Sequence, residues 1–364
     1  MADYKFRLPG NAHLSPADMF AAMSEWCRDN NVEHDVYGEG ELIQSFENKI
    51  ASLLGYEAGL FVITGTLAQC TALQLACESR GKFNVAMHQS SHVYLREAQG
   101  FQAQNRFNIF PVGQPYRPWQ LADLEQVQDP LGAMLYELPM REIGGQAPSL
   151  AQLKQITDYC HQQHIHTHLD GARLWETLSY YQQQDGELTY ADITQGFDST
   201  YVSLYKGING FGGAMLLGDA AFIRRAQVWM KRQGGNVFRR SPYIIAAAMQ
   251  FDQRIAQMPQ LFARTKQLYQ QVSHCSNMAL NPSKPQASMC HVHFPLSIEE
   301  MTQLRDKLAE SDQIWIGCPQ AGMLPNQCFI EWYIGDNLLK INEKQLQQIL
   351  AHIDNEIAAI IASR

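Results

Sequence analysis

The sequence is poor in the features that mark nucleic-acid-binding, secreted or membrane proteins. Charged residues make up only 18% of the chain, and the net charge of −8 comes without a basic block, which argues against a polyanion-binding surface. The eight cysteines are scattered without a Cys-x-x-Cys pair, so no disulfide framework is indicated. No apolar run approaches the ~18 residues that a membrane span needs, and the first residues show no signal-peptide pattern. We therefore expect a reduced, cytoplasmic protein that binds neither nucleic acid nor membranes.

What the chain does contain is a regular alternation of strand-like and helix-like segments. Expected strands are 59–63, 84–88, 131–137, 164–170, 199–204 and 214–217. Expected helices are 16–28, 42–53, 67–78, 91–99 and 150–162. Alternation with these lengths predicts an α/β fold, in which a mostly parallel sheet is covered by helices on both faces.

The pattern changes after about residue 241. A long helical region, 243–274, is expected to be interrupted at Pro259. It is followed by a strand (289–294), a helix (298–310), a strand (328–334) and a final helix (343–361). We predict an irregular N-terminal segment (1–15), a large domain (16–245) and a smaller C-terminal α+β domain (246–364).

Five polar residues fall at the expected carboxyl ends of strands, where ligands bind in parallel sheets. They are Thr64, His88, Glu137, Asp170 and Lys206. Lys206 follows a strand and precedes several glycines. A desolvated lysine there can attack an aldehyde cofactor. The alternative is a solvated lysine on a glycine-rich hairpin.

Two further motifs point to an anionic, ring-containing ligand. Thr64-Gly65-Thr66 lies where a strand becomes a helix, and such a turn can bind a phosphate, although many helices begin this way without a ligand. Asp170 suits a cationic ring nitrogen as its partner, and Arg173 suits an anion. A buried ion pair between them is the alternative, as is a metal site formed by the nearby histidines His164, His166 and His168.

Two weaker signals lie elsewhere. His92 could stack on a flat ring or transfer protons, or it could be an ordinary loop histidine. The basic segment 231–240 could contact a phosphate or a subunit interface, or it could be a solvated helix end.

In their order along the chain, these motifs resemble the threonine aldolase / β-eliminating lyase family of pyridoxal-phosphate (PLP) enzymes, over roughly residues 5–250. The resembling pieces are Asp35-Val-Tyr-Gly-Glu-Gly, Phe61-Val-Ile-Thr-Gly-Thr, Ser91-His-Val with Glu97, Glu137 with Gly144-Gly145, His168-Leu-Asp-Gly-Ala-Arg, Tyr205-Lys-Gly and Lys231 through Arg239. The resemblance implies the fold type I architecture of the aspartate aminotransferases.

The resemblance also implies how the cofactor would be held. Lys206 would bind it covalently as a Schiff base, Asp170 would keep its ring nitrogen protonated, and His92 would stack on the ring. The phosphate contacts would be Thr64, Gly65, Thr66 and Ser203, with Lys231 or Arg239 from a neighbouring subunit. A homodimer or homotetramer with shared active sites is therefore expected.

On the substrate side, the resemblance implies an amino acid substrate whose carboxylate binds Arg173. Tyr37, from a neighbouring subunit, and Glu97 are further expected contacts. The expected reaction is retro-aldol cleavage of a β-hydroxy amino acid to glycine and an aldehyde. The alternatives are β-elimination or other chemistry at Cα, and a PLP-binding protein without turnover.

The substrate side also departs from the family pattern. Glu137 is followed by Leu-Pro-Met-Arg, where threonine aldolases have Asn-Thr-His-Asn, so Met140 replaces a histidine that reaches the substrate hydroxyl. Arg7-Leu8-Pro9 lacks a serine that contacts the substrate carboxylate, and Phe329 stands where a second carboxylate-binding arginine is expected. We hypothesise that Arg141 supplies a replacement positive charge.

Overall fold

A computed structural model describes residues 4–324 and 326–364, which form two compact units. The larger unit comprises Leu14–Glu142 and Ala147–Ala256. The smaller unit comprises the N-terminal residues through His13, Ile143–Gln146 and Gln257–Arg364. Over the described ranges, no helix is both long and apolar enough to cross a membrane.

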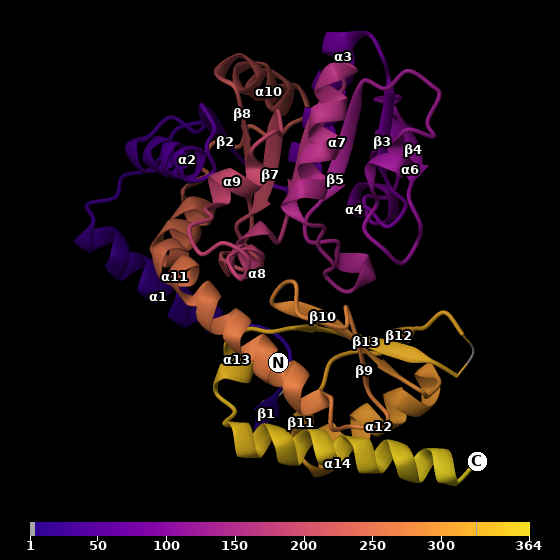
Figure 1. The fold of residues 1–364 in the computed structure, drawn as a ribbon. Coiled ribbons are helices and arrows are strands. Elements are labelled where there is room, and N and C mark those ends of the chain that lie inside the picture. Colours follow the sequence, from indigo (N-terminus) through magenta and orange to yellow (C-terminus); the bar gives the residue numbers. More distant parts are fainter. Residues whose placement is uncertain (1–3, 325) are drawn as a thin grey trace. The chain divides into compact units, whose positions relative to one another are not determined.

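The larger unit is built on a seven-stranded sheet (Figure 1). Its strands in spatial order are β2 (Ala58–Val62), β8 (Ala214–Gly218), β7 (Ser199–Ser203), β6 (His166–Gly171), β5 (Ala133–Glu137), β3 (Asn84–His88) and β4 (Asn108–Val112). Only β8 runs against its neighbours, which confirms the prediction of a mostly parallel α/β sheet. Strand β4, which carries Pro111, was not predicted from its mixed composition.

Helix α3 (Gly65–Arg80) follows β2 and packs with α10 (Ala220–Arg232) against the sheet. Leu60 and Leu216 from the strands, Ala72 from α3 and Ile223 from α10 share one core. Helix α7 (Leu150–Gln162), which the sequence predicts with these bounds, has Ser149 as its N-cap in a capping box. The other helices that begin in this unit are α1 (Pro16–Asp29), α2 (Glu41–Leu53), α4 (His92–Leu95), α5 (Gly100–Ala103), α6 (Leu121–Leu124), η1 (Arg141–Ile143), η2 (Leu174–Glu176), α8 (Leu178–Tyr181), α9 (Tyr190–Thr194) and α11 (Ser241–Val272).

Two predicted helices differ from the structure. The helix expected over 91–99 is only the single turn α4, because Ala98 and Gln99 adopt positive φ angles of 49° and 56°, which end a right-handed helix. The expected interruption at Pro259 does not occur, since α11 runs through it. A proline removes one backbone donor, and the buried Met258, Leu261 and Phe262 anchor this part of the helix.

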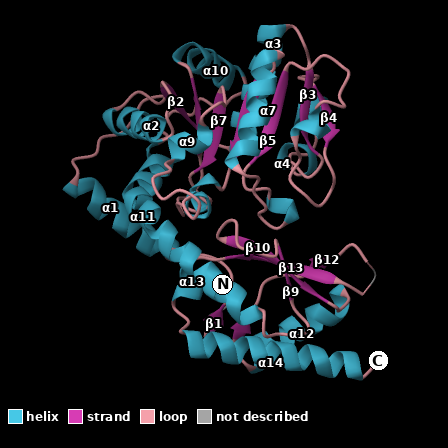
Figure 2. Cartoon of the chain, in the orientation of Figure 1, coloured by secondary structure: helices cyan, strands magenta, loops and turns pink. Residues whose placement is uncertain are grey.

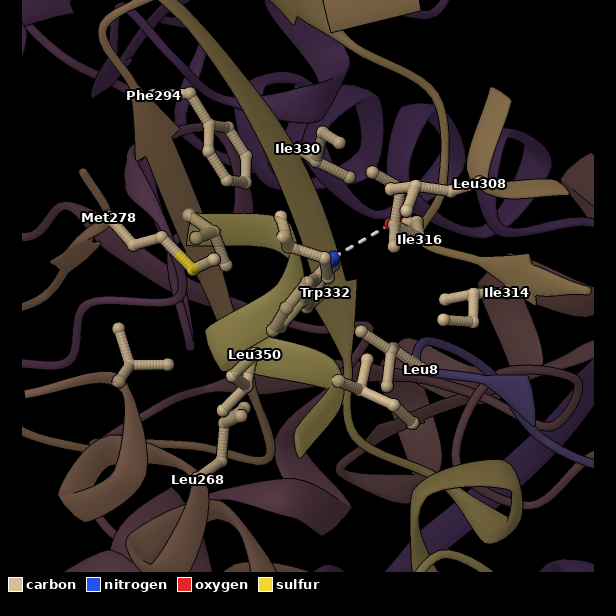
Figure 3. Packing of buried hydrophobic residues seen from close by; sticks show 14 of the residues in the cluster. Leu8, Leu268, Met278, Phe294, Leu308, Ile314, Ile316, Ile330, Trp332 and Leu350 are labelled. Atoms are coloured by element: carbon tan, nitrogen blue, oxygen red, sulfur yellow. Dashed lines mark hydrogen bonds between the residues drawn. The ribbon is translucent and has the colours of Figure 1, made fainter. Parts of the chain in front are cut away.

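The smaller unit contains a four-stranded antiparallel sheet of β12 (Gln320–Ala321), β13 (Cys328–Tyr333), β10 (Met289–Phe294) and β9 (Ala279–Asn281). Strand β1 (Phe6–Arg7), in the segment expected to be irregular, pairs with β11 (Ile314–Trp315). The helices are α12 (Ile298–Ser311), α13 (Asp336–Leu339) and α14 (Glu343–Ala362), with α14 beside α12 (Figure 2). Trp332 lies in the core, and its indole Nε1 donates to the carbonyl of Ile316 at 2.7 Å (Figure 3).

Within the larger unit, the carboxylate of Asp35 ties two distant loops together. It accepts hydrogen bonds from the backbone N–H groups of Gly38 (2.9 Å), Arg240 (2.9 Å) and Ser241 (2.8 Å) and from the Ser241 hydroxyl (2.5 Å). Burial of Asp35 opposes ionisation, but these hydrogen bonds outweigh it and hold the pKa of Asp35 below its ordinary value. The glycine-bearing loop after residue 34 is thereby fixed to the start of α11.

We predict that Asp35→Ala lowers the free energy of unfolding by about 3 kcal/mol at neutral pH, because several buried donors lose their acceptor. Since the folded-state pKa of Asp35 is lowered, its contribution is present above the ordinary aspartate range and is lost as pH falls through the lowered pKa. Urea unfolding should therefore show a smaller stability difference between wild type and Asp35→Ala in acid than at pH 7. The exposed Glu33→Ala is the matched control and should change stability by less than about 0.5 kcal/mol.

Candidate active site

A cavity of about 420 Å³ lies at the carboxyl ends of the central strands. Seven residues predicted from the sequence line it together, namely Thr64, Gly65, Thr66, His92, Glu97, Asp170 and Lys206. Asp170 lies near the end of β6, and the others follow β2, β3 or β7. The parallel arrangement brings the carboxyl ends of these four strands to one edge of the sheet. All of these elements belong to the larger unit.

Lys206 lies in a tight turn after β7. The N–H of Asn209 donates to the carbonyl of Lys206 (3.1 Å), and the N–H of Gly210 donates to Leu204 (2.9 Å). A Cβ on Gly210 would lie 2.7 Å from that same carbonyl oxygen, so the turn requires glycine there. Burial, with a smaller contribution from the Arg173 charge, lowers the pKa of Lys206 to about 8. The amine is therefore half neutral near pH 8 and can act as a nucleophile.

Asp170 presents a buried carboxylate to the same cavity. Its Oδ2 accepts from the Nε2 of Gln69 at 2.6 Å, and its Oδ1 accepts from the backbone N–H of Ala172 at 3.1 Å. The carboxylate is only 1% exposed, so these donors take the place of water around it. Asp170 can therefore pair with a cationic N–H group.

His92 is held by two carboxylates. Its Nδ1 lies 3.2 Å from Oε1 of the buried Glu97. Its backbone N–H donates to Oε2 of Glu137 at 3.1 Å, and the other oxygen of Glu137 accepts from the N–H of Arg141 at 3.0 Å. Burial raises the pKa of Glu137, and the neighbouring Asp170 raises it further. Glu137 thus links strand β5 to the backbone positions of both His92 and Arg141.

The N-terminus of α3 forms the anion-binding end of the cavity. Thr64 caps the helix by accepting from the N–H of Leu67 at 3.2 Å, while Gly65 and Thr66 lie in the first turn, where N–H groups have no intrahelical partner. A Cβ at Gly65 would lie 2.3 Å from the hydroxyl of Tyr201. Glycine is therefore needed to let the Tyr201 ring, which also lines the cavity, approach the start of the helix. A phosphate fits the positive end of the helix.

The remaining predicted residues lie elsewhere. Among the described residues, the lining of the cavity does not include Arg173, Ser203, Tyr37, Lys231, Arg239 or Arg141. Arg173 nevertheless lies close enough for its charge to influence Lys206 and Glu137. Ser203 is fully buried, and its hydroxyl accepts from the N–H of Tyr205 at 3.3 Å.

Tyr37 and Lys231 line a second cavity of about 530 Å³ in the larger unit. The Arg239 guanidinium bonds the carbonyl of Asp35 and lies 4.6 Å from the ring of Phe238. Tyr37 is 53% exposed, and Phe238 is 52% exposed.

The lining residues that were not predicted as site residues include Gln69, Tyr201, Tyr205, Phe211 and Tyr243. Gln69 lies one turn after Gly65, so helical periodicity could have placed it on the same side of α3. Tyr205 directly precedes Lys206, and this position is the signal that could have placed it in the site. Tyr243 comes from the start of α11, which no local pattern connects to this site. His88 belongs to a local network instead, because its ring nitrogens contact Ser90 Oγ (2.6 Å) and the carbonyl of Gln114 (2.8 Å).

Comparison with known proteins assigns this site to a family. The family described as Beta-eliminating lyase matches residues 15–295. The chain belongs to the beta-eliminating lyase family. This confirms the resemblance stated from the motifs, and it places the chain among PLP-dependent enzymes.

Solved structures of similar chains agree with this assignment. One, from Listeria monocytogenes and provisionally assigned as an L-allo-threonine aldolase, is 34% identical with a TM-score of 0.91, and the match covers 97% of each chain. Another, from Exiguobacterium sp. 255-15 and provisionally assigned as an aromatic amino acid beta-eliminating lyase/threonine aldolase, is 30% identical with a TM-score of 0.90, covering 97% of this chain and 98% of the other. The similarity confirms the fold type I architecture.

Among curated relatives, the low specificity L-threonine aldolase of Escherichia coli O157:H7 is 29% identical over 223 residues, which cover 60% of this chain and 65% of that protein. The alanine racemase TOXG of Cochliobolus carbonum is 30% identical over 221 residues, covering 59% and 55%. The chain thus spans between about half and two thirds of the length of these curated relatives.

We predict that, with any cofactor removed, acetylation of Lys206 rises with pH and reaches half of its maximal rate near pH 8, as its lowered pKa requires. Ordinary lysine amines have a pKa near 10.4, so only a small fraction of them is neutral and reactive at pH 8. Mass spectrometry of peptides can follow Lys206 beside the exposed Lys344 as an internal reference. A profile for Lys206 that rises in parallel with that of Lys344 would contradict the prediction.

Proposed function

We propose that the protein is a PLP-dependent lyase that cleaves a β-hydroxy amino acid of the threonine type into glycine and an aldehyde. The observation that carries the proposal is one cavity lined by a buried amine, a buried carboxylate, an imidazole and a helix N-terminus. These are the groups that the aldehyde, ring nitrogen, ring face and phosphate of PLP require.

The residues fit this cofactor on structural grounds. Gly65 lets the Tyr201 ring pack against the first turn of α3, whose N-terminus suits the phosphate. Asp170 is an acceptor for the ring N–H, and Lys206 has an amine that is partly neutral near pH 8. When bound, PLP draws electrons away from the Cα atom of an amino acid, which weakens the bonds at that carbon.

The chain's own residues would then handle protons and charge. The Nδ1 of His92 faces Glu97, so Nε2 is the ring nitrogen that can take the β-hydroxyl proton as the Cα–Cβ bond breaks. Arg173, whose charge already acts on Lys206, is the proposed partner of the substrate carboxylate. Burial of Asp170 and Glu97 strengthens the interactions that these two carboxylates make.

We also propose that a second copy of the chain completes the site. Tyr37, Lys231 and Arg239 lie together in or beside the second cavity, and Tyr37 and Phe238 are large exposed aromatic side chains. Such residues suit a homodimer or homotetramer in which the segments 35–38 and 231–239 approach the neighbour's cofactor phosphate. We further propose that the enzyme works in the cytoplasm.

A second candidate is another reaction at Cα, either β-elimination or racemisation. It is favoured by Met140, which replaces the histidine expected near the substrate hydroxyl, and by the similarity to an alanine racemase. Both candidates need the same cofactor-binding residues and differ only in the bond that is broken.

We predict that the purified protein shows a PLP absorbance band that shifts when amino acids are added, and that Lys206→Ala loses covalent cofactor and all turnover. Acetaldehyde and glycine formed from threonine support the aldolase, whereas pyruvate and ammonia from serine, or loss of alanine optical activity, support the second candidate. Lys206→Ala with added PLP should still bind the cofactor non-covalently. A wild-type protein that binds no PLP would overturn the proposal.

Substituting Arg141 tests the altered substrate side. If Arg141 contacts the substrate carboxylate, Arg141→Ala should raise KM roughly tenfold, since a charge-assisted hydrogen bond is lost. Arg96→Ala is the matched control, because both arginines bond Oε1 of Glu142 at 3.0 Å. An equal KM for wild type and Arg141→Ala would refute this role for Arg141.

A further inference from the structure

A row of buried polar side chains runs from Asp170 back along strand β6. Asp170 Oδ2 lies 2.6 Å from Gln69 Nε2, and Gln69 Oε1 lies 3.2 Å from His168 Nε2. Both His168 Nδ1 and His166 Nε2 then lie 2.8 Å from the hydroxyl of Ser199. All five side chains are at most 5% exposed, so each donor must find its acceptor within the row.

The chemistry of these groups allows two directions of donation. Burial lowers the pKa of His166 and of His168 to about 3, so both rings are neutral and each carries one hydrogen. If Asp170 is ionised, Gln69 donates to it, His168 carries its hydrogen on Nε2, Ser199 donates to His168, and His166 carries its hydrogen on Nε2. If Asp170 carries a hydrogen on Oδ2 and donates it to Gln69, the amide of Gln69 and both rings take the opposite arrangement.

The two ends of the row decide between these directions. At one end, Gln69 makes a short 2.6 Å bond to the buried Asp170 carboxylate. At the other end, Nδ1 of His166 lies 3.5 Å from Oδ2 of Asp198, whose side chain is 36% exposed and already accepts from the N–H of Thr167 at 2.9 Å. A short charge-assisted bond in a dry site outweighs a long contact to a solvated carboxylate. Donation therefore runs toward Asp170.

We propose that Gln69 is a positioning residue which, oriented by His168, Ser199 and His166, holds Asp170 as a fixed and ionised acceptor facing the cavity. This inference rests on the proposed function only for what Asp170 pairs with there, the cationic ring nitrogen. Protonating Asp170 on Oδ2, the oxygen that accepts from Gln69, would require the Gln69 amide to turn over and both imidazoles to change tautomer. The row thus opposes loss of the charge on Asp170 more strongly than one hydrogen bond does.

The direction of donation can be measured without turnover. In protein labelled with ¹⁵N-histidine, two-dimensional ¹H–¹⁵N spectra at pH 7.5 should show His166 and His168 as neutral rings with hydrogen on Nε2. Single substitutions His166→Gln and His168→Asn assign the two signals among the twelve histidines. Hydrogen on Nδ1 of His168, or a doubly protonated ring, would overturn the proposed direction, whether or not the protein is a PLP enzyme.

The positioning role is tested with Gln69→Leu and two ligands: PLP, and its analogue with a carbon in place of the ring nitrogen. The variant should bind PLP roughly tenfold more weakly and the analogue equally well, because only PLP pairs with Asp170. Gln74→Leu, on the same helix but outside the cavity lining in the described chain, is the matched control and should change neither affinity.

If Gln69→Leu lost affinity for both ligands equally, the effect would be merely structural and the positioning role would be refuted. Wild-type protein that binds neither ligand would instead refute the proposed function, while the histidine spectra would still decide the direction of donation. Retention of the melting temperature within a few degrees in both variants confirms that each has folded.

Discussion

The structure depends on keeping charged groups ionised, or ready to ionise, in a place that excludes water. Moving a carboxylate or an amine out of water costs several kcal/mol unless donors or opposite charges replace the solvent. Asp170 meets this requirement with an amide and a backbone N–H, whereas Lys206 meets it only in part, and its pKa falls. The difference suits the proposed function, which requires Asp170 to act as an acceptor and Lys206 to lose a proton.

Helix α3 supplies several groups of the site from one element. Its N-terminus provides Gly65 and Thr66, its next turn provides Gln69, and its apolar side packs against the sheet and α10. The distance between the anion-binding end and Asp170 is therefore fixed by a rigid helix, not by a loop. Strand register adds the second constraint, because Glu137 and Asp170 are direct neighbours across β5 and β6.

Much of this arrangement could be predicted from the sequence, because it follows from periodicity and from chain direction. Strand ends in a parallel sheet share one edge, which is why Thr64, Asp170 and Lys206 could be brought together without coordinates. Gln69 and Tyr201 were missed because an amide in a helix and a tyrosine in a strand look like ordinary core residues. The brief strands β1, β9, β11 and β12, with two or three residues each, are too short for any period to be visible.

The residues that contact the substrate are harder to predict from the sequence, and the reason is structural. The proposed cofactor-binding groups lie at the ends of strands or at the start of a helix. Met140 and Arg141 lie instead in a short segment between β5 and α7 whose backbone is held partly by Glu137. A side chain on such a segment can change without disturbing the sheet that holds Lys206 and Asp170. Chains with the same cofactor-binding residues can therefore differ in the reaction that they catalyse. The bond that is broken is then decided by which group faces the substrate's β-carbon, and the family's fold alone does not fix that choice.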